Sequence, residues 1–182
     1  MLSVYYENLI QRVLDNSQNN TWDKAVKEWY IYSCQKDESC QSQCVCGKEN
    51  IKYLFVIKNL LNKKMIFPIG SSCIKKFGRN DLNEQISICE QLFDLLNLVR
   101  NNKYISIEHF SRKLLAYLYE RGAFKPTAYN QFNGINDYNF MVDMFNKRKE
   151  PTKAQKSKIR GIIFYSIVFA CRFCRFFQLI KP

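Results

Sequence analysis

The chain has very little histidine and few acidic side chains. Its 182 residues include one histidine, His109, and 16 acidic residues against 28 basic ones. The sequence assigns no serine, cysteine or aspartate to a catalytic arrangement with His109, so nucleophilic catalysis assisted by histidine is not expected. We expect His109 to lie at the surface or at the start of a helix.

Long apolar runs and an export signal are absent as well. The longest apolar run, Ile162 to Cys171, has ten residues before Arg172 interrupts it, whereas a membrane helix needs about 20. We expect this run to form a buried helix. The first residues, MLSVYYENLIQRVLD, lack the apolar core of a signal peptide, which favours a cytoplasmic location. In that reducing compartment, closely spaced cysteines indicate a metal site more often than disulfides.

Positive charge is what the chain has in excess, with a net charge of +12. Residues 34–80 hold nine basic and three acidic side chains (+6), and residues 145–182 hold ten and one (+9). Hydrophobic residues make up 47% of the chain, so the charge belongs to a folded surface. Such a surface attracts polyanions, although a basic face without a ligand is the alternative. We therefore expect duplex DNA to be bound without sequence specificity. The expected contacts are Lys147, Arg148, Lys149, Lys153, Lys156, Lys158 and Arg160, with Lys75, Lys76 and Arg79 as a second patch.

The spacing of apolar residues predicts an α+β fold that is mostly helical. The expected elements are helices over 3–14 and 22–30, a β-hairpin over 51–57 and 65–69 with Pro68 at an edge, and a short helix around Cys73. Further helices are expected over 81–99, from 108 or 111 to 121, over 137–145 and over 152–177. Thr152 and Gln155 form the capping box of the last helix. We expect two lobes: residues 1–80, with N-terminal helices and the cysteine-rich hairpin, and residues 81–182, which are helical and end in a basic helix.

The cysteines of CQSQCVCGK (40–48) precede the hairpin, and Cys73 follows it. A turn with Cys44 and Cys46, then a hairpin, then a cysteine on a helix is the order of ligands in a treble-clef zinc site. We expect structural zinc held by Cys40, Cys44, Cys46 and Cys73, with Cys34 as the substitute for Cys40. The alternative is that these thiols bind no metal. Cys89, Cys171 and Cys174 are expected to pack in the core.

Residues 22–77 resemble a family of small proteins encoded by bacteriophages and prophages of Gram-positive hosts. The matching residues are Ala25, Trp29, Cys44, Cys46, Gly47, Asn59, Gly70, Ser71, Cys73, Ile74, Lys76 and Phe77. Many relatives have histidine after the glycine of the turn, where this chain has Lys48. Residues 111–126 and 137–148 also resemble the C-terminal part of such phage proteins.

The resemblance implies a host-defence inhibitor, because the sequence is similar to phage-type inhibitors of the RNA-guided nuclease Cas9 (anti-CRISPR proteins). Such a protein would bind Cas9, or Cas9 with its guide RNA, in the cytoplasm of the bacterial host cell. Cas9 holds nucleic acid in positively charged channels, so a chain of net charge +12 would not act there as a DNA mimic. It would hold duplex DNA through its own lysines.

The alternative function is a zinc-stabilised DNA- or RNA-binding accessory protein of phage replication or transcription. An enzyme is not expected. A nuclease built on a treble clef needs histidine and acidic ligands beside the hairpin, and residues 34–80 offer only Asp37, Glu38 and Glu49.

Overall fold

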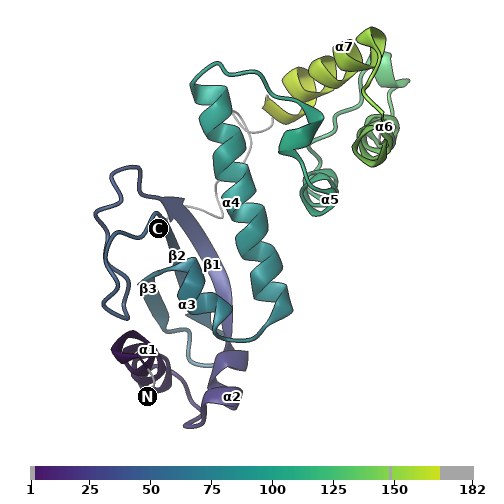
Figure 1. The fold of residues 1–182 in the computed structure, drawn as a ribbon. Helices are drawn as coiled ribbons and strands as arrows, with labels where there is room; N and C mark the ends of the chain where they lie inside the picture. Colours follow the sequence, from purple (N-terminus) through teal and green to yellow (C-terminus); the bar gives the residue numbers. More distant parts are fainter. Residues whose placement is uncertain (1–2, 148, 169–182) are drawn as a thin grey trace. The chain divides into compact units, whose positions relative to one another are not determined.

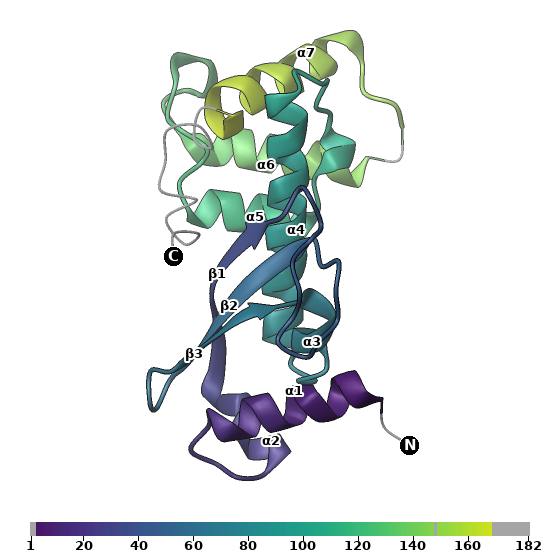
Figure 2. The ribbon, with the colours of Figure 1, turned by 90° about the vertical axis from the view of Figure 1, so that its left-hand side faces the viewer.

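The computed structural model describes residues 3–147 and 149–168. These residues form an α+β fold in which helices predominate, with one antiparallel sheet of three strands in the order β1-β2-β3 (Figures 1 and 2). They divide into two compact units, one ending at Ser87 and one beginning at Ile88. This division falls inside helix α4 (Asn80–Arg100).

The first unit contains the sheet. Its elements before α4 are α1 (Val4–Asp15), α2 (Trp22–Ala25), η1 (Val26–Glu28), β1 (Trp29–Lys36), β2 (Tyr53–Asn59), β3 (Met65–Ile69) and α3 (Ser71–Lys75). The predicted first helix, hairpin and short helix are confirmed. Strand β3 lies at the edge of the sheet, which suits Pro68 because proline has no N–H to donate to a neighbouring strand. Figure 1 shows α3 lying against the strands.

Strand β1 corrects the prediction of a single helix over residues 22–30. The helical segment ends at Glu28, and from Trp29 onward the chain pairs with β2, beginning with Trp29 opposite Asn59. Trp29 is fully buried, and its indole N–H donates to Ser17 Oγ at 2.9 Å. Pairing with a strand far along the chain therefore overrides the helical spacing of this segment, and its aromatic residues suit a strand.

The core of the first unit joins α1, the sheet, α3 and the start of α4. Its fully buried side chains include Leu9, Val13, Trp29, Phe55, Ile57, Ile69, Ile74, Leu82 and Ile86. In the first helix, Leu9 is fully buried and Ile10 is half-buried. The sheet is therefore covered by helices that come from both sides of it in the sequence.

The second unit is helical. Its elements after α4 are η2 (Ile107–His109), α5 (Arg112–Glu120), η3 (Ala128–Asn130), α6 (Gly134–Asn146), α7 (Lys153–Ile162) and the π-helical turn η4 (Ile163–Val168). Its buried core contains Leu92, Leu95, Leu114, Leu115, Leu118, Met141, Ile159 and Ile162. Helices α5 and α6 lie side by side (Figure 2).

Capping residues in the sequence predicted the start of α7 correctly but not the start of α6. The capping box of α7 is confirmed, because the Thr152 N–H donates to Gln155 Oε1 at 3.0 Å and the Gln155 N–H donates to Thr152 Oγ1 at 3.3 Å. Helix α6, by contrast, begins at Gly134 rather than at Asp137, because the Asn133 side chain caps it by accepting the Ile135 N–H at 3.1 Å.

The apolar run from Ile162 is not a uniformly buried helix. Ile162 and Ile163 are buried, but Phe164 and Tyr165 are 62% and 65% exposed. Cys171 and Cys174 lie outside the residues that the structure describes. Within the described part of the chain, every helix is too short or too polar to cross a membrane.

Candidate metal centre and basic surface

Three cysteine thiols meet in the interior of the first unit. Cys44, Cys46 and Cys73 are each at most 5% exposed. The Cys73 sulfur lies 3.6 Å from that of Cys44 and 3.4 Å from that of Cys46, and all three sulfurs lie within 4.8 Å of one another. Three buried thiols at these separations could hold a metal ion.

A tight turn places two of these thiols. The Gly47 N–H donates to the Cys44 carbonyl at 2.8 Å, and the Cys44 N–H donates to the Lys48 carbonyl, also at 2.8 Å. Gly47 has a φ of +95°, a backbone conformation that glycine adopts without steric cost. The turn is fixed to β3 because the Val45 N–H donates to the Pro68 carbonyl at 2.9 Å.

The third thiol reaches the cluster because α3 directly follows β3. The strand ends at Ile69, and the Gly70 N–H donates to the Cys44 sulfur at 3.3 Å. Cys73 lies in α3, where Ile74 beside it is fully buried. The predicted order of turn, hairpin and short helix therefore brings Cys44, Cys46 and Cys73 together.

The thiols differ in how readily they lose a proton. The Cys73 thiol stabilises the thiolate of Cys44 and, although burial acts in the opposite direction, the pKa of Cys44 falls to about 5. The same interaction with Cys44, burial and the negative charge of neighbouring thiolates raise the pKa of Cys73. One thiolate therefore forms readily, whereas a full set of thiolates needs a positive charge beside it, which a bound metal ion would supply.

Cys40 does not join this cluster. Its thiol donates to the Asp37 carbonyl at 3.6 Å, and its φ is +53°. The Asp37 carboxylate accepts hydrogen bonds from the backbone N–H groups of Ser39 and Ser42 at 2.9 and 3.0 Å, so residues 37–42 form a self-contained turn. The hydroxyls of Ser39 and Ser42 also donate to this carboxylate and hold the pKa of Asp37 well below its usual range. Cys34, the predicted substitute, is buried in β1 and is not part of the cluster either.

The predicted patch at Lys75, Lys76 and Arg79 is only partly available to a ligand. Lys75 and Lys76 are exposed, and the Lys76 ammonium lies 4.7 Å from the centre of the Tyr6 ring. The guanidinium of Arg79, however, donates to the carbonyls of Val26 and Trp29 and to the Asp81 carboxylate. Arg79 therefore links the start of α4 to the start of β1. Because its guanidinium N–H groups are used in these hydrogen bonds, few of them can contact DNA.

The basic residues before and within α7 lie on the surface. The exposed ones are Lys147, Lys149, Lys153, Lys156, Lys158 and Arg160, and Arg148 lies outside the described residues. Lys153, Lys156 and Arg160 follow the i, i+3, i+7 spacing of a single helix face. Lys156 forms an ion pair with Glu150. Lys158 lies on another face, with its ammonium 4.3 Å from the centre of the Phe140 ring.

His109 lies at the surface in η2, in accordance with the prediction. Its Nδ1 accepts the Ser106 N–H at 3.1 Å and completes the cap of this short helix. The single histidine is thus used to hold a local turn.

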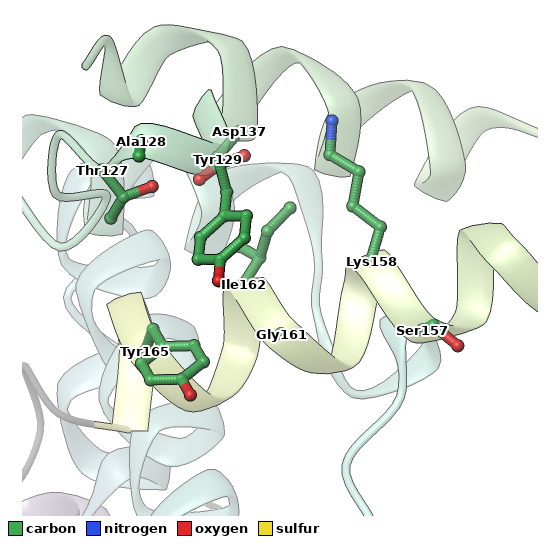
Figure 3. Close-up of a pocket in the computed structure, with 9 residues that line it drawn as sticks. All are labelled: Thr127, Ala128, Tyr129, Asp137, Ser157, Lys158, Gly161, Ile162 and Tyr165. Carbon is green, nitrogen blue, oxygen red and sulfur yellow. The ribbon is translucent and has the colours of Figure 1, made fainter. Parts of the chain in front are cut away.

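A pocket of about 500 Å³ on the second unit was not predicted from the sequence (Figure 3). Its walls include Tyr129 in η3, Asp137 in α6, Lys158, Gly161 and Ile162 in α7, and Tyr165 in η4. The sequence contains little indication of this pocket, because it does not show whether a tyrosine such as Tyr129 or Tyr165 is exposed or buried.

No protein-family model, curated protein or solved structure matches this chain, so the resemblance to phage proteins rests on the quoted residues alone.

Proposed function

We propose that this protein is a non-enzymatic nucleic-acid-binding protein whose cysteine cluster binds zinc and stabilises the first unit. The observation that carries the proposal is the basic face of α7, where Lys153, Lys156 and Arg160 are exposed along one side of the helix. Phosphates neutralised by these side chains would release counterions, which gives binding that is unspecific in sequence and sensitive to salt.

The neighbourhood of this face strengthens the proposal. Between residues 145 and 160 the acidic residues amount to Glu150 alone, and the segment that precedes α7 adds the exposed Lys147 and Lys149. The ion pair of Lys156 with Glu150 is exposed, so it is weak, and a phosphate can replace the carboxylate at little cost. Duplex DNA is the partner expected from the sequence.

Zinc is proposed for the cysteine cluster because of the donor set and its spacing. A tetrahedron with Zn–S distances of about 2.3 Å has sulfurs about 3.8 Å apart, close to the 3.4 and 3.6 Å between Cys73 and its neighbours. The turn, hairpin and short helix around the thiols support a treble-clef-like lobe. Bound zinc would link the 44–47 turn to α3 and would stabilise the first unit without performing chemistry.

Three thiolates leave a fourth coordination position on the zinc. Cys40 would fill it only if the turn over residues 37–42 released the thiol from the Asp37 carbonyl. A water molecule would fill it otherwise, and Lys48 occupies the place of the histidine found in many of the phage proteins that the chain resembles.

The experiment that tests nucleic-acid binding compares two charge-reversed variants by fluorescence anisotropy with labelled duplex DNA. In one variant Lys153, Lys156 and Arg160 are replaced by Glu. In the control, Lys24, Lys27 and Lys52 are replaced by Glu; these residues are exposed in the first unit, and the change in net charge is the same. We expect the first variant to lose binding and the control to retain most of it. Equal losses would mean that only net charge matters.

Inhibition of Cas9 is the narrower form of this proposal. It is supported by the resemblance, whose signature residues Cys44, Cys46, Gly47 and Cys73 belong to the candidate metal centre. The test is plasmid cleavage by guide-loaded Cas9 with a stoichiometric amount of the protein and an excess of unrelated DNA. Inhibition that persists in the excess DNA would support binding to Cas9 itself. Normal cleavage would leave the accessory nucleic-acid-binding function.

A further inference from the structure

The pocket on the second unit has an aromatic entrance. Tyr129 in η3 is 92% exposed and Tyr165 in η4 is 65% exposed, yet both line the same pocket. Figure 3 shows the Tyr129 side chain extending toward α7, with Ile162 beside its ring and Tyr165 on the helical turn that follows. Two tyrosine rings that are not covered by the protein provide flat apolar surfaces on which a nucleobase can stack.

The interior of the pocket offers a hydrogen-bond acceptor. Asp137 lines the pocket and is 5% exposed, and its Oδ2 accepts the Asn130 side-chain N–H at 2.7 Å. Its Oδ1 accepts no hydrogen bond from the other described residues. A carboxylate oxygen that lines a pocket and accepts no hydrogen bond from these residues can accept one from a ligand. The N–H groups on the Watson–Crick edge of a base are suitable donors, whereas a phosphate would be repelled.

One basic side chain lines the pocket. Lys158 reaches it from α7, whereas Lys153 and Arg160 are exposed on another face of the same helix. A strand whose base entered the pocket would therefore have the Lys158 ammonium beside it for a phosphate. Charge complementarity thus favours a nucleotide chain over an apolar peptide as the occupant.

Space is also available along the helix. A Cβ atom built on Gly161 would meet no other atom within 4 Å, so the pocket wall is open at this position. The volume of about 500 Å³ is ample for one base with part of its sugar.

We propose that this pocket binds an unstacked base of single-stranded nucleic acid, with the base stacked on Tyr129 and Tyr165 and its N–H edge toward Asp137. This inference rests on the proposed nucleic-acid-binding function and deepens it by naming the form of nucleic acid that the second unit prefers. A base paired within a duplex is stacked on its neighbours and would have to be extruded before it could enter the pocket.

The first test measures binding of a labelled single-stranded oligonucleotide of mixed sequence by fluorescence anisotropy. We expect Tyr129→Ala and Tyr165→Ala each to weaken this binding by about 5- to 100-fold, as loss of base stacking does. Tyr129→Phe and Tyr165→Phe keep the rings and should bind nearly as the wild type does. Phe132→Ala is the matched control, because Phe132 is 74% exposed in the same loop but does not line the pocket.

The second test fills the pocket without removing a contact. Gly161→Leu should place a side chain in the space for the base and weaken single-strand binding about tenfold or more. Because leucine favours helix more than glycine does, this variant should not lower the melting temperature. Weakened binding together with undiminished stability would exclude unfolding as the cause.

The outcomes separate this inference from the proposed function. If the wild type binds single strands and the tyrosine and Gly161→Leu variants bind them equally well, the pocket proposal is overturned while nucleic-acid binding by the basic face stands. If the wild type binds neither single strands nor duplexes at low salt, both fail. Weakened binding of single strands with unchanged binding of duplexes supports both.

Discussion

Glu28 is a buried carboxylate that joins three segments of the first unit. Its oxygens accept hydrogen bonds from Asn59 Nδ2 at 2.6 Å, from the Gln18 N–H at 2.9 Å and from the Asn19 N–H at 2.8 Å. Burial alone would raise the pKa of Glu28, but these donors outweigh burial and lower the pKa to about 2. Glu28 therefore holds the loop after α1 against the end of β2.

The low pKa of Glu28 makes the first unit sensitive to acid. Because the folded pKa of about 2 lies below the ordinary value of 4.5, the contribution of Glu28 to stability is fully present above pH 4.5 and is lost as the pH falls toward 2. We expect Glu28→Gln to destabilise the protein by about 2 kcal/mol at neutral pH. As the pH is lowered from 4.5 to 2, the melting temperature of this variant should also fall less steeply than that of the wild type. A slope equal to that of the wild type would contradict this role.

Gly134 and Gly161 form a matched pair of helical glycines with opposite surroundings. A Cβ atom on Gly134 would lie 2.1 Å from the Phe124 carbonyl oxygen, whereas one on Gly161 would meet nothing within 4 Å. Gly134→Ala should therefore destabilise the protein by about 1–3 kcal/mol, while Gly161→Ala should stabilise it by up to about 1 kcal/mol. Urea unfolding of both variants checks this. Equal changes in the free energy of unfolding would mean that the backbone at Phe124 moves aside at little cost.

At the scale of elements, local signals predicted some parts well. The hairpin, helix α5 and the capping box of α7 depend on residues a few positions apart, and the sequence contains them all. The three thiols could also be predicted to meet, because the turn, the hairpin and α3 follow one another directly.

Other features depend on partners far along the chain, and the sequence did not predict them. Strand β1 exists because it pairs with β2, although its first residues have helical spacing. Arg79 was expected at the DNA surface, but its acceptors Val26 and Trp29 lie about 50 positions away. Cys40 was expected in the metal site, but the hydrogen bonds of Asp37 fold its turn separately.

The cysteine cluster should act as one element with the hairpin and α3. We expect Cys73→Ser to lose bound zinc and to lower the melting temperature of the first unit, because metal binding and folding are coupled. Chelation of the wild type should have the same effect, and zinc affinity should fall at low pH because the thiols must lose their protons. Zinc content by mass spectrometry and thermal melts are the measurements.

Cys40→Ser is the matched control for the metal site. Since Cys40 lies outside the cluster, this variant should keep its zinc and its melting temperature. Loss of zinc from Cys40→Ser would show that Cys40 moves to become the fourth ligand. An unchanged zinc content in Cys73→Ser would contradict the metal site.

At the scale of the whole molecule, some basic side chains stabilise the fold and others are free to bind phosphate. Arg79 serves the fold, whereas the exposed residues before and within α7 have few partners that compete with a phosphate. The charge in residues 145–182 should therefore dominate binding of nucleic acid. Binding by this surface requires no enzymatic group.

The measurement that tests this account most directly is the salt dependence of DNA binding by the wild type and by the variant with Glu at Lys153, Lys156 and Arg160. Four or five phosphate contacts predict a slope of log K against log salt of about −4 for the wild type, measured between about 50 and 200 mM salt. The slope for the variant should be smaller in magnitude by about three units, because three phosphate contacts are removed. A slope near zero for the wild type, or the same slope for both proteins, would contradict the proposal that the basic face of α7 binds nucleic acid.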